Sequence, residues 1–516
     1  MDAFIPRLMN TFSRLRGWRG KLACFIAGAL LALGFAPFHA WPLLFICLPF
    51  LFLMLDKARH WRSAALYGWA FGYGHMMAGT YWIANALTVD MEQFGWLMPI
   101  SILGLSLVMG IWFALFGALY RSLRTARISA NILRFAVLWV VVEYLRSLGM
   151  FGFPWNLVGS MALAHTPMAQ FLAFVGPYGM SFVLVLLGVL PVLWLTGAVN
   201  ARMRQKIGIM ACLVVIALNV VGAMRLPEKA ALTETRVRVV QGNIAQSLKW
   251  TPQGRNESAQ IYGTLSRQQT GEAIPSIILW PETALPFTLR EISPWPEQVA
   301  QLLPPGGMLI TGAVRSTGGE GDYQLYNSIV GIDAAGEWRD AYDKHQLVPF
   351  GEFVPLRSLL SLNKITAGSI DFSRGEGVRT VQLDTVPAYR PLVCYEVIFP
   401  WLSAGGVRPA WLVNATNDAW YGMSPGPFQH YDAARMRAIE QGLPLVRAAN
   451  TGISAVIDPY GRAVARLGLN ERGIVDQALP KALPLTLYAR WGEMVTLILL
   501  GLCWIITTTS RFCAKK

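Results

Sequence analysis

Long apolar runs dominate the first 224 positions, and each is about as long as a helix must be to cross a bilayer. They lie near 22–38, 41–55, 64–87, 96–120, 131–149, 168–196 and 207–224, and an eighth lies near 492–509. Backbone polar groups in lipid must be satisfied within their own segment, so these runs predict helices. We therefore expect a membrane α-helical bundle of eight transmembrane helices.

The pattern changes after Arg225, where short β-branched runs alternate with amphipathic stretches. Strands are predicted at 237–244, 276–282, 308–314, 326–333, 390–397, 411–418, 444–452 and 453–465, and helices near 254–270, 293–303, 397–404 and 428–442. Strands and helices mixed along a chain predict a layered α/β domain. The expected division is a seven-helix membrane domain over 1–224, an α/β domain over 225–491, and the eighth helix with a tail over 492–516.

Composition agrees with a membrane protein, because 54% of the residues are hydrophobic and only 14% are charged. The net charge of +14 is not evenly spread: residues 225–493 hold 25 Lys and Arg against 25 Asp and Glu. The excess lies in the membrane half and the tail, which favours a role in topology over a nucleic-acid partner.

Loop charge predicts the orientation of the helices, since Lys and Arg gather on the cytoplasmic side. Basic residues occupy the N-terminal arm, alternate loops and the tail: Arg7, Arg14, Arg16, Arg19, Lys21, Lys57, Arg59, Arg62, Arg121, Arg124, Arg127, Arg134, Arg202, Arg204, Lys206, Arg511, Lys515 and Lys516. The loops near 37–42, 88–95 and 150–167 contain no Lys or Arg. Both termini are therefore expected in the cytoplasm, with 225–491 on the outer side.

Cysteine usage points to one residue. Of the six cysteines, Cys394 is the only one in the polar half, so it has no partner there for a disulfide. No CxxC or Cys/His cluster is present, and neither a metal nor a cofactor is expected.

Three predicted strands end in residues that together suggest covalent catalysis. SIILWPE ends in Glu282, YDKHQLVPFGE contains Lys344, and PLVCYEVIFP contains Cys394. Glu282 would accept the thiol proton, and Lys344 would stabilise the thiolate and then an oxyanion. A Cys394–His345 dyad and a purely structural cysteine stay open as alternatives.

These residues lie in motifs with a family resemblance. WPE (280–282), DKHQLVPFGEFVP (343–355), VCYE (393–396) and NATNDAW (414–420) resemble the nitrilase, or carbon-nitrogen hydrolase, superfamily. With QGNIAQSLKW (241–250), GPFQHYDAARMRAIE (426–440) and the eight apolar runs, nearly the whole chain resembles the apolipoprotein N-acyltransferase family of Gram-negative inner membranes.

The resemblance implies an αββα sandwich with a Glu-Lys-Cys triad. Cys394 would be the nucleophile, Glu282 the general base and Lys344 the stabilising cation, and the supporting residues would be Glu352, Tyr395, Glu396 and Trp250.

The implied reaction is a two-step, ping-pong acyl transfer. Cys394 would take an acyl chain from a membrane phospholipid, with phosphatidylethanolamine the expected donor, and a thioester would pass it to a diacylated apolipoprotein. Both substrates are embedded in membrane lipid, which fits an outer-side catalytic domain resting on the inner membrane.

Other interpretations remain. The same triad would suit a membrane-tethered hydrolase of small amides or nitriles that uses water as acceptor. A third interpretation is a transporter or lipid-binding protein whose soluble half is only a receptor. Glu143 and Arg146 are interpreted either as functional intramembrane charges or as a structural pair that anchors GFPWN (152–156). The segment 356–373 is interpreted either as a lid that dips into lipid or as simple packing on the domain.

Overall fold

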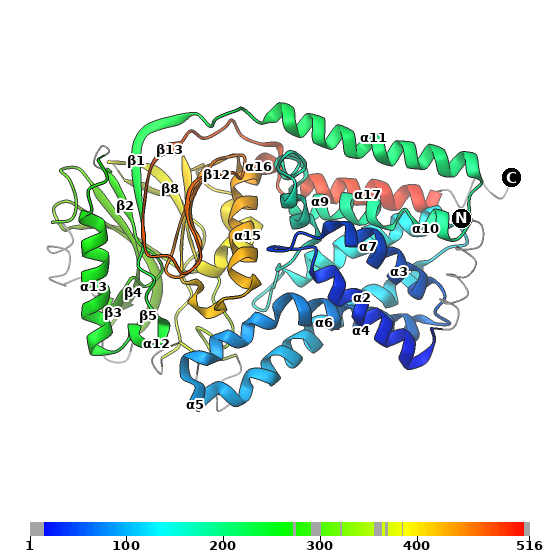
Figure 1. Ribbon diagram of the computed structural model, residues 1–516, viewed down its shortest axis with the longest axis horizontal. Coiled ribbons are helices and arrows are strands. Elements are labelled where there is room, and N and C mark those ends of the chain that lie inside the picture. Colours follow the sequence, from blue (N-terminus) through cyan, green and yellow to red (C-terminus); the bar gives the residue numbers. More distant parts are fainter. Residues whose placement is uncertain are drawn as a thin grey trace.

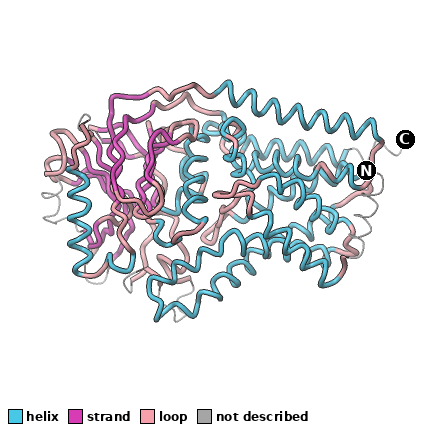
Figure 2. The backbone as a smooth tube through the Cα atoms, in the orientation of Figure 1, coloured by secondary structure: helices cyan, strands magenta, loops and turns pink. Residues whose placement is uncertain are grey.

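The computed structural model describes residues 15–271, 275–289, 301–319, 322–355, 364–366, 370–383 and 385–509. Strands gather at one end of the molecule and long helices at the other (Figure 2). We call these the α/β half and the helical half. They lie side by side along the longest axis (Figure 1).

A helix occupies each of the eight predicted apolar runs. The long helices are α2 (Gly17–Ala32), α3 (Leu44–Asp56), α4 (Trp61–Thr80), α6 (Met98–Leu123), α7 (Ile128–Arg146), α9 (Leu172–Val189), α11 (Ala201–Arg225) and α17 (Met494–Thr509). Short helices and turns join them: η1 (Trp41–Leu43), η2 (Tyr81–Asp90), α5 (Met91–Phe94), η3 (Gly95–Leu97), η4 (Val158–Ala164), α8 (Thr166–Ala169) and α10 (Val192–Leu195).

Four helical stretches in the described residues are long and apolar enough to cross a membrane: Trp61–Leu123, Ile128–Arg146, Leu172–Leu195 and Ala201–Arg225. The first of them contains both α4 and α6. The chain is therefore built as a membrane protein.

One helix is shorter than its apolar run, and another lies on the outside of the bundle. The run at 22–38 forms a helix only to Ala32, and the residue before Pro37 is disfavoured in helical conformation, which limits how far the helix can continue. Helix α11 lies along the outside of the helical half (Figure 1), and Leu218 and Gly222 are its only buried residues. Its apolar length is therefore exposed.

Glycines set the close approach of α2, α4 and α6. A Cβ added at Gly28 of α2 would lie 1.9 Å from the carbonyl oxygen of Phe71 in α4, and one at Gly74 would lie 2.0 Å from that of Phe25. Small residues let helix backbones approach in membranes, where packing rather than the hydrophobic effect drives association. The bundle depends on these positions having no side chain.

The α/β half contains two sheets. The first has the order β13-β1-β2-β4-β5-β6 with β3 beside β4, and the second has the order β12-β11-β10-β9-β8-β7. The strands are β1 (Leu232–Gln241), β2 (Ile277–Leu279), β3 (Leu285–Leu289), β4 (Met308–Thr317), β5 (Gln324–Asp333), β6 (Trp338–Asp343), β7 (Val381–Leu383), β8 (Val386–Val393), β9 (Trp411–Thr416), β10 (Leu445–Ala449), β11 (Ser454–Ile457), β12 (Ala463–Leu467) and β13 (Gly473–Pro480).

Successive side chains of the buried strands enter different cores, as the period of two along a strand requires. Ile277 and Leu279 of β2 pack between the sheets, whereas Ile278 packs on the outer face. In the second sheet Val393 points between the sheets and Leu392 points outward. Both sheets are therefore covered on both faces.

Helices cover the two outer faces, as the αββα expectation requires. Helix α13 (Pro252–Arg267) lies against the first sheet, and α15 (Pro425–Gln441) lies between the second sheet and the helical half (Figure 1). Residues of α15 such as Ile439 belong to the same buried cluster as residues of the helical half. The remaining helical elements are α12 (Gln246–Lys249), η5 (Cys394–Ile398), η6 (Pro400–Ser403), η7 (Asp418–Tyr421) and α16 (Leu487–Trp491).

One predicted helix is not formed, and two other predicted segments lie largely outside the described residues. The helix expected near 397–404 is wrong: two 3-10 turns, η5 and η6, occupy the region, and Pro400 starts the second of them. The helix predicted at 293–303 and the segment 356–373 lie largely outside the described residues.

The first and last strands of the α/β half are neighbours. Strand β1 pairs antiparallel with β13, from Leu232 opposite Pro480 to Gln241 opposite Gly473. Lys481 N–H then donates to Ala231 O at 2.8 Å. The chain therefore arrives from α11 and leaves toward α17 at one place.

Replacing Gly28 by leucine should destabilise the protein, because the side chain has no room beside Phe71 O. Overpacking typically costs about 1–3 kcal/mol. We expect a lower melting temperature in detergent for Gly28→Leu, measured by size-exclusion after heating. Gly104→Leu on α6 is the control, because no atom lies within 4 Å of a Cβ there. Equal melting temperatures would contradict the packing argument.

Candidate active site

Cys394 lies where β8 ends. Val393 is the last strand residue, and Cys394 begins η5 with φ of 48°. That left-handed conformation is uncommon for a residue with a side chain and is found at functional sites held by their surroundings. The turn projects the thiol from the edge of the second sheet.

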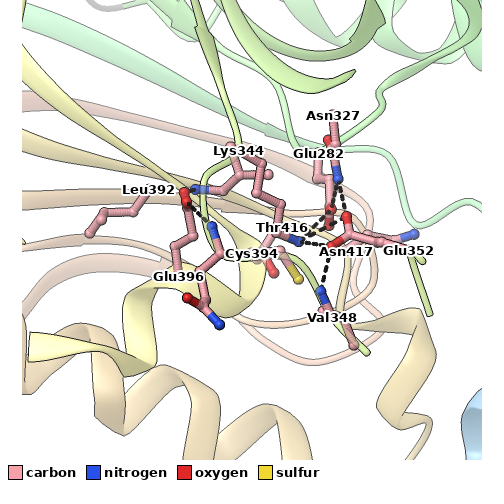
Figure 3. Close-up of polar contacts among 12 residues, drawn as sticks. Glu282, Asn327, Lys344, Val348, Glu352, Leu392, Cys394, Glu396, Thr416 and Asn417 are labelled. Atoms are coloured by element: carbon pink, nitrogen blue, oxygen red, sulfur yellow. Dashed lines mark hydrogen bonds and ion pairs between the residues drawn. The ribbon is translucent and has the colours of Figure 1, made fainter. Parts of the chain in front are cut away.

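Glu282 and Lys344 come from the first sheet. Glu282 follows β2 by three residues and precedes Thr283, which also has a positive φ of 47°. Lys344 directly follows β6. Figure 3 shows these side chains converging with Cys394 and Glu352.

Lys344 is held between two carboxylates. Its Nζ lies 2.9 Å from Glu352 Oε2 and 4.0 Å from Glu282 Oε1. The amide of Asn327 donates to both acids, at 2.7 Å to Glu282 and 2.8 Å to Glu352. Val348 N–H donates to Glu352 at 2.8 Å. Glu352 is thus fully engaged, whereas Oε2 of Glu282 is buried without a hydrogen-bond partner.

Burial and charge decide the protonation states. Burial raises the pKa of the Cys394 thiol, Glu282 raises it further, and Lys344 opposes both. Burial also raises the pKa of Glu282, against the influence of Lys344. Burial alone would lower the pKa of Lys344, but Glu352 and Glu282 outweigh it and hold that pKa above its ordinary value. The resting site is therefore a thiol, and its reactivity requires a base to take the proton.

Glu396 ties the Lys344 loop to the Cys394 turn. Its Oε1 accepts from Tyr342 Oη at 3.0 Å and from the N–H groups of His345 and Gln346 at 2.8 and 3.1 Å. Its Oε2 accepts from Val393 N–H at 2.8 Å. Four donors on one buried carboxylate join the ends of β6 and β8, which come from different sheets.

The other expected supporting residues lie around this centre. Tyr395 points to the helical half, where its hydroxyl donates to Gly152 O at 3.0 Å. Trp250 is half-buried at the end of α12, next to Lys249. Within the part of the chain that the structure describes, neither residue forms a hydrogen bond or ion pair with the thiol.

The sequence did not single out Asn327 or Lys249. Lys249 is buried, and its Nζ donates to the backbone oxygen of Glu282 at 3.3 Å; burial lowers its pKa to about 8. Sequence features could have pointed to both residues, because Asn327 is polar within an apolar strand and Lys249 lies in the motif QGNIAQSLKW.

His345 does not form the alternative dyad. Its Nδ1 lies 2.9 Å from Gly375 O, and its Nε2 lies 2.6 Å from Arg374 Nη2. Both ring nitrogens are engaged away from Cys394, which leaves Glu282 as the neighbouring base.

The structure favours the anchoring role for Glu143 and Arg146. Arg146 Nη1 donates to Trp155 O at 3.1 Å, and Glu143 Oε1 accepts from Val158 N–H at 3.0 Å. Both side chains thus hold the segment that follows α7.

Comparisons with known proteins cover both halves. Residues 27–190 match the family described as apolipoprotein N-acyltransferase N-terminal domain, and residues 236–483 match the carbon-nitrogen hydrolase family. An apolipoprotein N-acyltransferase from Rhodopseudomonas palustris is 40% identical over 95% of this chain and 95% of its own length. One from Bradyrhizobium diazoefficiens is 39% identical over 98% of this chain and 99% of its own.

Among solved structures, the chain is similar to a CN-hydrolase superfamily protein from Xanthomonas campestris, with 18% identity and a TM-score of 0.36. That likeness covers 48% of this chain and 91% of the other.

Gly312 of β4 is where the backbone packs against the Glu282 turn. An added Cβ would lie 2.4 Å from Glu282 Cα and 2.6 Å from Pro281 O. Gly312→Ala should therefore displace the carboxyl and slow alkylation of Cys394 by iodoacetamide about tenfold or more, as loss of a positioned base does. Peptide mass mapping of samples taken over time gives the fraction of Cys394 that is alkylated, and hence the rate.

Gly319→Ala is the matched control, because a Cβ at Gly319 meets no atom within 4 Å. Equal alkylation rates in the two variants would show that the position of Glu282 does not govern the thiol.

Proposed function

The chain belongs to the apolipoprotein N-acyltransferase family, and from that membership we propose that it N-acylates apolipoproteins through a thioester on Cys394. The acyl chain would come from a membrane phospholipid, with phosphatidylethanolamine as the expected donor. The acceptor is the α-amine of an N-terminal S-diacylglyceryl cysteine. The buried cluster of Cys394, Glu282 and Lys344 is the observation that supports this chemistry.

In the first half-reaction the thiol proton moves to Glu282, whose Oε2 is free to accept it. The sulfur attacks the ester carbonyl of the phospholipid, and the oxyanion forms beside Lys344 and the N–H of Tyr395. The C–O bond then breaks, and the departing alkoxide takes the proton from Glu282 and leaves as a lysophospholipid. The acyl chain remains on Cys394 as a thioester.

In the second half-reaction the neutral α-amine attacks the thioester and gives its proton to Glu282. Collapse of the intermediate breaks the C–S bond, and the thiolate recovers the proton from Glu282. One amide is formed and the enzyme returns to its starting state. Ping-pong kinetics are expected, because the same site serves the two half-reactions in turn.

Burial of the site supports aminolysis over hydrolysis. Cys394 is 5% exposed, Lys344 1% and Glu282 6%, so water has little access to a thioester there. A site that excludes water protects a reactive intermediate until its acceptor arrives.

The same proposal includes the topology. Eight crossings by α2, α3, α4, α6, α7, α9, α11 and α17 would place both termini in the cytoplasm. The division into 1–224, 225–491 and 492–516 then gives a periplasmic catalytic domain on a Gram-negative inner membrane. Basic loops on one side of the helices support this orientation. The two interpretations of 356–373, a lid that dips into lipid and simple packing on the domain, are both kept, because most of that segment lies outside the described residues.

The central test is Cys394→Ala in detergent with phosphatidylethanolamine and a diacylated lipopeptide. We expect at least a thousandfold loss of N-acylated product, because no nucleophile remains; loss of a nucleophile costs on the order of 10⁶-fold in some enzymes. Wild-type protein with phospholipid alone should gain one acyl mass on the Cys394 peptide.

Cys212→Ala in α11 is the control, because that thiol is exposed on the outside of the helical half. Undiminished product from Cys394→Ala would remove the thioester from the mechanism. Steady release of fatty acid without an acceptor would favour the hydrolase alternative.

The pH profile of kcat/KM should depend on Asn327. Glu282 must be deprotonated to act as a base, so activity falls as the pH drops through its raised pKa. Asn327 lowers that pKa through its hydrogen bond. Asn327→Leu should move the acid limb to higher pH, because the Glu282 carboxylate loses a hydrogen bond that favours its charged form.

Gln324→Leu on the exposed end of β5 serves as control. An acid limb that stays in place in Asn327→Leu would assign it to a group other than Glu282.

A further inference from the structure

The backbone oxygen of Cys394 lies within hydrogen-bond distance of a side chain on α15, 36 residues away along the chain. His430 of α15 lies with its Nε2 3.1 Å from Cys394 O. His430 is fully buried. Because a carbonyl oxygen only accepts, Nε2 must carry the proton.

The other ring nitrogen is held by a buried ion pair. Nδ1 lies 2.9 Å from Asp418 Oδ1 and 3.1 Å from Arg447 Nη2. Arg447 Nη2 in turn donates to Asp418 Oδ2 at 2.6 Å. Burial and the Arg447 charge lower the pKa of His430, whereas Asp418 and the hydrogen bond to the Cys394 carbonyl oppose them.

Aromatic rings hold the imidazole on its faces. Trp155 from the helical half stacks on it at a centroid distance of 5.6 Å and an angle of 25°, and Tyr421 meets it edge-on at 5.4 Å. Trp155 is itself fixed, since its Nε1 donates to Gln429 Oε1 at 2.7 Å. The ring of His430 therefore has a single orientation set by both halves of the protein.

The Cys394 carbonyl and the Tyr395 N–H belong to one planar peptide unit. In a trans peptide these two groups point in opposite directions, so fixing the oxygen aims the N–H. A hydrogen bond to the oxygen also polarises the unit and strengthens the N–H as a donor. This N–H is the backbone donor that the acyl-transfer mechanism uses at the oxyanion.

We propose that His430 is a positioning residue for acyl transfer: its Nε2–H holds the Cys394–Tyr395 peptide so that the Tyr395 N–H faces the oxyanion. The inference rests on the proposed thioester chemistry at Cys394. The histidine touches no reacting atom. It acts on the transition state through the peptide, so it should affect kcat far more than KM.

Two substitutions that introduce a side-chain amide, His430→Gln and His430→Asn, distinguish this positioning role from a role in packing alone. In His430→Gln the side-chain amide nitrogen can take the place of Nε2 and still donate to Cys394 O. In His430→Asn the amide reaches only the place of Nδ1, beside Asp418 and Arg447, and the donor to Cys394 O is lost. Both replacements are polar, and both remove the stacked ring.

The experiment measures the rate of acyl-enzyme formation with phosphatidylethanolamine alone, by intact mass, and then kcat and KM for the lipopeptide. We expect His430→Asn to lose about a hundredfold in the acylation rate, the scale of one oxyanion donor, with KM within about twofold. His430→Gln should recover at least tenfold of that loss. His165→Gln, at an exposed histidine, should match the wild type.

Equal rates in His430→Asn and His430→Gln, with similar melting temperatures, would overturn the positioning role. A hundredfold change confined to KM would also overturn it, because the ring would then act in binding. If wild-type protein forms no acyl-enzyme on Cys394, the proposed function fails instead, and the two failures are therefore distinguishable.

Discussion

One buried ammonium group, that of Lys344, makes the whole site possible. Two carboxylates, Glu282 and Glu352, lie against it. Acids so close together cannot both stay ionised out of water without a cation between them. Removing one partner of such a cluster leaves an uncompensated buried charge, which is far more damaging than losing a surface pair. The strand ends, the turn at Cys394 and the brace of Glu396 all serve to keep these groups in place.

The division of labour between the two sheets follows from that constraint. The base and the cation come from the first sheet and the nucleophile from the second, so the site exists only while the sheets are packed together. Glu396 bonds across this boundary, from the Cys394 turn to the Lys344 loop. The buried residues between the sheets, such as Val393 and Leu279, supply the apolar contact that holds the two surfaces in register.

Patterns along the chain were sufficient for much of this architecture. Apolar runs located the eight helices, and the β-branched runs located strands such as β4 and β9 because those strands are buried on both faces. Strand β6 (WRDAYD) was located only at its end, by the stretch that begins at Tyr342, because the strand is polar and half-exposed and neither an apolar run nor alternation marks its start. Asn327 and His430 were missed for another reason: their importance lies in contacts with Glu282 and Cys394, 45 and 36 residues away along the chain. No local pattern records such a contact.

The adjacent strands β1 and β13 have an evolutionary consequence. Since the α/β half begins and ends on hydrogen-bonded neighbours, it has the geometry of a cassette inserted between α11 and α17. Such a cassette can be gained, lost or exchanged as one unit while the flanking helices keep their places.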